Sequence, residues 1–196
     1  DPRVVALLKA GASLEDRIEA HVEMDEIDEA MDLLEQALAK YNALLVLQPT
    51  SHVGLRRLAD ALLRKAGALR GKEADELYVK AVEAYDTDIT AHNLQETHRS
   101  KVLAMIDRAK NKAEEEEARG AFPQTRRLLS EAKKAAAYVK QREDLMAMIT
   151  EVEDYCRPKK TNATSASASS VASTAARKSA PDTAEVVARK SAPDTS

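Results

Sequence analysis

Apolar side chains recur every three or four residues along most of the first 157 positions of this 196-residue chain. The pattern is clearest between about residues 25 and 47, where its members are Ile27, Ala30, Met31, Leu34, Ala37, Leu38, Tyr41, Leu44 and Leu45. This spacing aligns them on one face of an α-helix, where packing against other helices buries them. With no Trp and one Phe, the core must consist mainly of Leu, Ala, Val and Met, which suits closely packed helices. The sequence therefore predicts an all-α fold.

Start and stop signals divide the first 87 residues into four helices. Ser13 and the acidic residues that follow it have the form of a capping box, which begins a short first helix. The second helix covers about residues 25 to 47 and ends before a proline. Ser51 can cap a third helix, and a fourth covers about residues 72 to 85. We expect residues 1–87 to form a bundle of short antiparallel helical hairpins.

Longer helices are predicted from residue 88 onward. Asp88 has the character of an N-cap, and no Gly or Pro follows it until Gly120. After a turn at residues 120–123, apolar residues at near-heptad spacing continue to Arg157. At about 1.5 Å per residue, two such helices form an antiparallel hairpin roughly 45 to 50 Å long. We therefore expect residues 88–157 to form a long helical hairpin that packs on the preceding bundle.

The composition changes abruptly after Pro158. Residues 158–196 are rich in Ser and Ala, and residues 161–170 lack the apolar side chains that would offset the entropy lost on ordering, so we expect a disordered tail. The eight-residue unit Ala-Arg-Lys-Ser-Ala-Pro-Asp-Thr occurs twice without change, at residues 176–183 and 188–195. From Arg157 on, seven Lys or Arg stand against three Asp or Glu, which leaves a net charge of −7 on the preceding residues. The tail is therefore basic and the helical part is acidic.

The acidic charge of the helical part argues against binding to nucleic acid, because a phosphate-binding surface needs clustered positive charge. No apolar run has the length of a transmembrane helix, so we expect no membrane span. The single cysteine, Cys156, excludes an intramolecular disulfide and fits a reducing compartment. We therefore expect an intracellular protein, located in the cytoplasm rather than in the nucleus.

No group of residues has the spacing that catalysis or metal binding requires. The four histidines, His21, His52, His92 and His98, include no pair four residues apart, and Cys156 has no histidine close to it in the sequence. The sequence also lacks a Gly-rich phosphate loop and a nucleophile motif. We expect a protein without catalytic activity, metal or cofactor, whose partner is a protein or a peptide. The sequence leaves its oligomeric state open.

Two of the expected helices carry a small residue, an aromatic residue and a position for a second small residue at fixed intervals, and Leu44 occupies that last position in the first copy. The members of this pattern are Ala37, Tyr41, Leu44 and Pro49, then Ala74, Tyr78 and Ala81, with Leu58 and Ala59 on the helix between them. A poorer third copy consists of Gly120, Phe122, Leu129 and Ala132. The pattern resembles the tetratricopeptide repeat (TPR) family, although the copies lie 37 residues apart rather than about 34, and Asp86 replaces the second proline. The resemblance implies packed helix pairs that recognise a peptide or a helix.

The tail unit resembles a second kind of protein. Residues 175–181 are similar to the histone H3 tail around a lysine that is methylated and a serine that is phosphorylated. The resemblance implies modification of Lys178 and Ser179, and of Lys190 and Ser191 in the second copy. A phosphate at either serine would add nearly two negative charges beside two cations, and would thereby switch the charge of the unit.

Residues 28–38, with their continuation to Pro49, are similar to the long second helix of MIT (microtubule interacting and trafficking) three-helix domains. The MIT and TPR resemblances both imply recognition of a peptide or helix. We therefore expect a non-enzymatic adaptor or scaffold with such a groove and a phosphorylatable tail. Two alternatives stay open. In the first, the chain is a structural subunit that assembles through the hairpin at residues 88–157. In the second, it is a substrate of histone-tail-modifying enzymes through its repeated tail unit.

Overall fold

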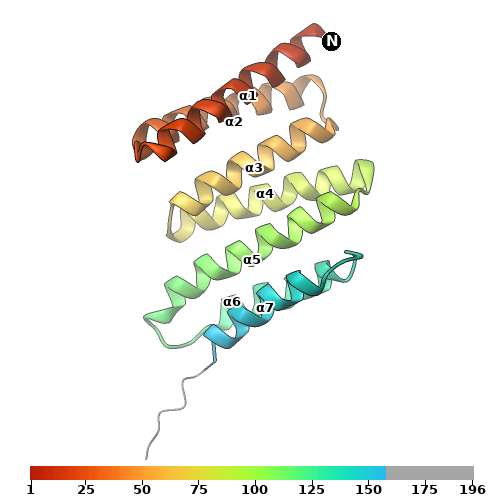
Figure 1. Ribbon diagram of the computed structural model, residues 1–196. Helices are drawn as coiled ribbons and strands as arrows, with labels where there is room; N and C mark the ends of the chain where they lie inside the picture. Colours follow the sequence, from red (N-terminus) through yellow and green to blue (C-terminus); the bar gives the residue numbers. More distant parts are fainter. Residues whose placement is uncertain (158–196) are drawn as a thin grey trace, which may run out of the picture. The chain divides into compact units, whose positions relative to one another are not determined.

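The computed structural model describes residues 1–157, and this part of the chain consists of α-helices joined by short connections (Figure 1). The helices are α1 (Pro2–Glu23), α2 (Ile27–Leu47), α3 (His52–Ala68), α4 (Gly71–His92), α5 (Gln95–Glu117), α6 (Pro123–Ala136) and α7 (Glu143–Tyr155). No β-strand occurs among the described residues. The prediction of an all-α fold is therefore confirmed.

Consecutive helices pair as antiparallel hairpins, α1 with α2, α3 with α4 and α5 with α6, and α7 packs on both α5 and α6. Neighbouring hairpins contact each other through α2 and α3 and through α4 and α5. Figure 1 shows α1, α3, α5 and α7 following one another in one row, with α2, α4 and α6 behind them. This arrangement of helical hairpins is compatible with a TPR-like repeat.

Small residues allow these helices to approach one another closely. Fully buried alanines at the helix contacts are Ala37, Ala59, Ala66, Ala74, Ala81 and Ala104. Ala61 of α3 lies in the apolar core of the α1–α2 hairpin, and Ala104 of α5 lies in the core of the α3–α4 hairpin. The second and third hairpins therefore each place a small side chain in the core of the preceding hairpin. These small side chains keep the interior close-packed along the row.

The first helix is longer than predicted. α1 begins at Pro2, so Ser13 lies inside the helix and does not cap it. Gly11, two residues before Ser13, also lies within the helix. It faces α2 at the point where the ring of Tyr41 packs. A Cβ atom at residue 11 would lie 2.5 Å from Cε1 of Tyr41. Packing against α2 therefore requires a glycine at this position.

The boundary predicted at residue 88 falls inside α4, which continues to His92. Asn93 then adopts the left-handed conformation, with φ at 49°, and ends the helix. Asp88 is therefore not an N-cap. Its fully buried carboxylate instead accepts hydrogen bonds from the side chains of His52 at the start of α3 and Thr97 in α5.

The second arm of the predicted long hairpin is two helices and not one. α6 ends at Ala136, and α7 begins at Glu143 after a connection that crosses the first turn of α5. The backbone N–H of Lys140 donates to Oε1 of Gln95 at 3.1 Å, and Arg99 pairs with Asp144. These contacts hold the connection in place, so that α7 packs in the angle between α5 and α6 instead of extending α6.

Glu116 is a buried acidic residue that caps α6 from the end of α5. It accepts the backbone N–H groups of Gln124 and Thr125, both at 3.1 Å, and the Thr125 hydroxyl at 2.8 Å. Burial by itself raises the pKa of Glu116, but these hydrogen bonds outweigh it and hold the pKa below its ordinary value. Because the folded-state pKa is the lower one, the stabilisation is present above the unfolded pKa and is lost as pH falls through the folded pKa.

We expect Glu116→Gln to lower the free energy of unfolding by about 1 to 2 kcal/mol at neutral pH, because hydrogen bonds to a charged acceptor are the stronger ones. The deficit should shrink as pH falls below about 4.5, where the unfolded wild-type side chain takes up its proton. Urea unfolding at a series of pH values measures both effects, with the exposed Glu151→Gln as control. Parallel stability curves for wild type and Glu116→Gln would contradict this account.

Candidate functional site

The residues predicted from the TPR-like pattern lie mainly in the helix contacts. The buried members are Ala37, Tyr41, Ala59, Ala74, Tyr78 and Ala81. Leu58 is partly buried, and Pro49 is exposed in the connection between α2 and α3. The buried residues pack the hairpins together and therefore do not form an open binding surface.

Two contacts between a tyrosine and an acid identify equivalent positions of the first two hairpins. The Tyr41 hydroxyl donates to Glu15 of α1 at 2.6 Å, and the Tyr85 hydroxyl donates to Asp60 of α3 at 2.7 Å. Burial, together with the neighbouring carboxylate, raises the pKa of both tyrosines well above the ordinary value. The structural counterpart of Tyr41 is therefore Tyr85, whereas the sequence pattern had paired Tyr41 with Tyr78.

This correspondence gives an offset of 44 residues between the hairpins in place of 37. At the new offset the identical pairs between α2 and α4 are Glu29 and Glu73, Ala30 and Ala74, Leu33 and Leu77, Ala37 and Ala81, and Tyr41 and Tyr85. The repeat was missed because two tyrosines of α4, Tyr78 and Tyr85, lie on the same buried face. Only the contact with the preceding helix distinguishes them.

An apolar groove of about 540 Å³ lies at the tip of the α1–α2 hairpin, where α1 ends and α2 begins. Its lining residues are Ile18, Glu19, Val22, Glu23, Ile27, Ala30, Met31, Leu34, Arg64 and Ala68. Val22 and Ile27 are 53% and 46% exposed, which is high for large apolar side chains that belong to a helical stripe. The groove exists because α3 ends at Ala68, so no further turn of α3 covers the inner face of the tip. We call this site the tip groove.

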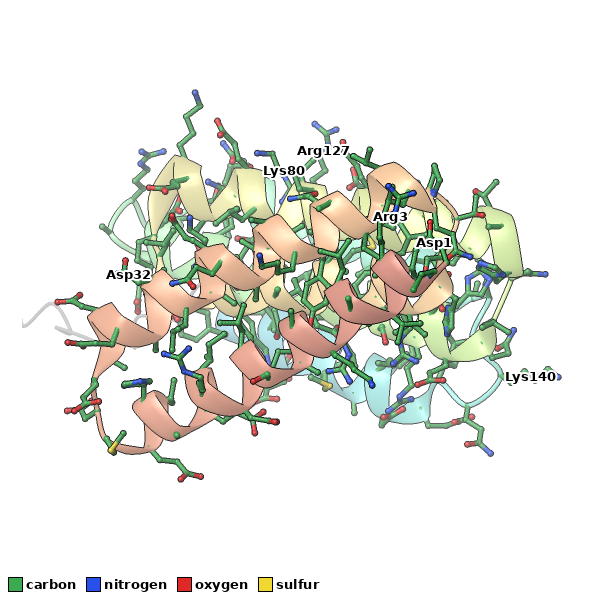
Figure 2. All side chains as sticks on the ribbon, turned by 90° about the horizontal axis from the view of Figure 1, so that it is seen from above. Asp1, Arg3, Asp32, Lys80, Arg127 and Lys140 are labelled. Atoms are coloured by element: carbon green, nitrogen blue, oxygen red, sulfur yellow. The ribbon has the colours of Figure 1, made fainter. Side chains whose placement is uncertain are left out.

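The segment that forms the hairpin tip is acidic, and its Glu19 and Glu23 line the tip groove. Between Glu19 and Glu35 the chain holds eight Asp or Glu and no Lys or Arg. Three of the eight are paired: Glu19 with Arg64 at 3.1 Å, Glu26 with His21 at 2.6 Å, and Glu35 with Lys65 at 2.8 Å. The other five, which form no ion pair with a described residue, are Glu23, Asp25, Asp28, Glu29 and Asp32. Figure 2 shows Asp32 on the outside of the ribbon near this tip.

The turn at the tip is well defined by its own hydrogen bonds. Asp25 adopts a positive φ of 62°, and the N–H of Glu26 donates to the carbonyl of His21 at 2.9 Å. This bond closes the end of α1 in the manner of a helix C-cap. The acidic tip is therefore held in a fixed conformation beside the tip groove.

A second groove, of about 580 Å³, lies between α2 and α4 above α3. Leucines form its floor, namely Leu38, Leu55, Leu58, Leu62 and Leu77. Its border is polar and of mixed charge, with Asn42, Lys80, Glu83 and Thr87. Most of the leucines belong to the core between the hairpins or pack against it, so this groove is the natural surface between two packed hairpins.

A cluster of polar side chains joins three helices around Asp88. Nδ1 of His52 lies 2.8 Å from one carboxylate oxygen, and the Thr97 hydroxyl donates to the same oxygen at 2.6 Å. Nε2 of His92 lies 2.7 Å from the Thr50 carbonyl and 3.8 Å from the other oxygen of Asp88. Since every one of these groups has a hydrogen-bond partner within the cluster, its evident role is to fix the junction of α3, α4 and α5.

The remaining predictions concern the tail residues, metal binding, membrane spans and the cysteine. Lys178, Ser179, Lys190 and Ser191 lie outside the described residues. Within residues 1–157 no three His, Cys, Asp or Glu side chains are arranged to hold a metal ion. Among the described helices none is long and apolar enough to cross a membrane. Cys156 is a buried free thiol whose pKa is raised by burial.

The fold and the tip groove define the class of protein: an all-α protein of packed helical hairpins with an acid-bordered apolar groove at one hairpin tip. A scan against protein-family models found no match, and searches of curated proteins and of solved structures found no significant match.

Proposed function

We propose that this protein is a non-enzymatic adaptor that binds a peptide or helix of another protein in the tip groove. The observation that carries this proposal is the groove itself, in which Val22, Ile27 and Met31 border an open apolar volume of about 540 Å³. Contiguous apolar surface that its own chain leaves open commonly marks an interaction site. A groove between two helices suits the apolar face of a third helix.

Further support comes from the hairpin arrangement and from the TPR and MIT resemblances, which both imply recognition of a helix or peptide. We also place this adaptor in the cytoplasm. The support for that compartment is the single cysteine, which fits a reducing environment.

Comparison of two double variants tests the proposal. Val22→Ser with Ile27→Ser removes apolar side chains from the tip groove. Val46→Ser with Val53→Ser removes apolar side chains outside it that are at least as exposed, since Val46 is 81% and Val53 is 48% exposed. We expect proteins that co-purify with the full chain to be lost from the groove variant and retained by the control variant. Thermal unfolding should show that both variants remain folded.

Retention of every partner by the groove variant would contradict the proposal, and so would an equal loss from both variants. Turnover of a substrate by the purified full chain would also contradict it, since the proposed adaptor performs no chemistry.

The two alternatives from the sequence remain predictions. A structural subunit that assembles through residues 88–157 should sediment as an oligomer at micromolar concentration, and a monomer would count against it. A substrate of histone-modifying enzymes should incorporate label at Lys178, Ser179, Lys190 or Ser191 when incubated with methyltransferases and kinases that act on histone tails. Absence of label would count against that role.

A further inference from the structure

We propose that the occupant of the tip groove is a basic amphipathic helix, with apolar side chains on one face and Lys or Arg beside them. This inference rests on the proposed function and adds the chemistry of the partner.

The shape of the groove favours a helix. α3 packs along the α1–α2 hairpin and contributes Ala61 to its core, and it stops at Ala68 where the groove begins. The groove lies beside the end of α3, which lines it with Arg64 and Ala68, and over the faces of α1 and α2 that here present Ile18, Val22 and Met31. A helix with apolar residues at i, i+3 or i+4, and i+7 would complete the packing that α3 leaves unfinished.

The border of the groove favours a basic partner. Glu23, Asp25, Asp28, Glu29 and Asp32 form no ion pair with a described residue. Asp28 and Glu29 lie in the first turn of α2, where negative charge also stabilises the helix N-terminus. Glu23 is in the last turn of α1, where negative charge opposes the helix dipole, and Asp32 is past the first turn of α2. Helix stability thus explains two of these acids and leaves Glu23, Asp25 and Asp32, of which Glu23 lines the groove and is available to a partner there.

Basic residues near the C-terminal end of α3 already form ion pairs with the α1–α2 hairpin. Arg64 and Lys65 of α3 pair with Glu19 of α1 and Glu35 of α2, one on each side of the hairpin. A helix in the groove would carry its Lys or Arg past Glu23 in the same way. Long basic side chains also cover apolar surface with their stems while the charge remains at the border. The same acidic border repels nucleic acid and anionic lipid surfaces.

Three synthetic helical peptides of about 18 residues test the partner chemistry. They share the same leucine positions and carry Lys, Gln or Glu at the polar positions. In fluorescence anisotropy with the full chain at about 50 mM salt, we expect the Lys peptide to bind about tenfold or more tightly than the Gln peptide, and the Glu peptide to bind weakest. Raising the salt to about 500 mM should reduce the advantage of the Lys peptide.

Variants locate the binding. Val22→Ser with Ile27→Ser should weaken the Lys peptide by about tenfold, and Val46→Ser with Val53→Ser should leave it unchanged. Glu23→Gln should weaken the Lys peptide several-fold and leave the Gln peptide unchanged. Glu23 is exposed, so this variant reports on charge even if the groove variant is unstable.

Each other outcome overturns the inference in an identifiable way. Equal affinity for the Lys and Gln peptides, with both lost in the groove variant, would mean that the tip groove binds a helix without selecting charge; the proposed function would then stand. Undiminished binding of the Lys peptide to the groove variant would mean general attraction to an acidic surface. Sedimentation of the full chain as a dimer that the groove variant dissociates would mean that a second copy occupies the groove. No binding of any peptide, combined with partners that co-purify regardless of the groove, would remove both proposals.

Discussion

Replacement of Asp88 by Ala is expected to lower the free energy of unfolding by about 3 kcal/mol, because it breaks a buried charged hydrogen-bond cluster. The Asp88 carboxylate is fully buried and accepts bonds from His52 and Thr97, so its removal leaves the buried Thr97 hydroxyl without an acceptor. At the equivalent position of the first hairpin, the chain has the buried apolar residue Leu44. The cluster therefore belongs specifically to the junction of α3, α4 and α5.

Urea unfolding of the full chain measures this effect, with Asp16→Ala as the control at an exposed position of α1. Thr97→Val should cost less than Asp88→Ala, and the double variant should cost less than the sum of the two, because both substitutions remove the same hydrogen bond. A change of less than about 0.5 kcal/mol for Asp88→Ala would show that the cluster does not stabilise the junction.

The second large effect is expected at Gly11, where Gly11→Val should lower the free energy of unfolding by about 2 to 3 kcal/mol. A Cβ atom there would lie 2.5 Å from Cε1 and 2.6 Å from Cζ of Tyr41. The ring cannot easily move away, because it is buried and its hydroxyl is bonded to Glu15. α1 and α2 would have to separate to admit the new side chain.

Gly67 provides a matched control for this prediction. It also lies within a helix, α3, but a Cβ atom there would have no neighbouring atom within 4 Å. Gly67→Val should therefore change the stability by less than about 0.5 kcal/mol. Equal destabilisation by both substitutions would contradict the packing account, because helix propensity itself favours valine over glycine.

The sequence predicted helices well where their stripes were long and their ends carried clear signals. α2 was expected at about residues 25 to 47 and occupies Ile27–Leu47, because its stripe is continuous and a proline follows it. It predicted helix ends poorly where the deciding contact comes from another helix. Gly11 and Asp88 look like boundary residues, yet Tyr41 explains the first and His52 and Thr97 explain the second.

The candidate site shows the same division. Ile27 and Met31 belong to the stripe that predicted a buried face of the second helix, and both were expected in the core. Met31 packs against the core of the α1–α2 hairpin, but both residues also border the tip groove beside the end of α3. Periodicity identifies an apolar face, but it carries no information on how far the neighbouring helix extends over that face.

The sequence by itself determined that this chain is all-α, which residues form the apolar stripes, and that the helical part is acidic, since these properties follow from local spacing and composition. Only the tertiary structure decided that Tyr41 corresponds to Tyr85, that the second arm of the C-terminal hairpin breaks into α6 and α7, and that one hairpin tip remains open. The physical reason is that each of these depends on contacts between residues about 25 to 45 positions apart, which the pattern within a single helix does not encode.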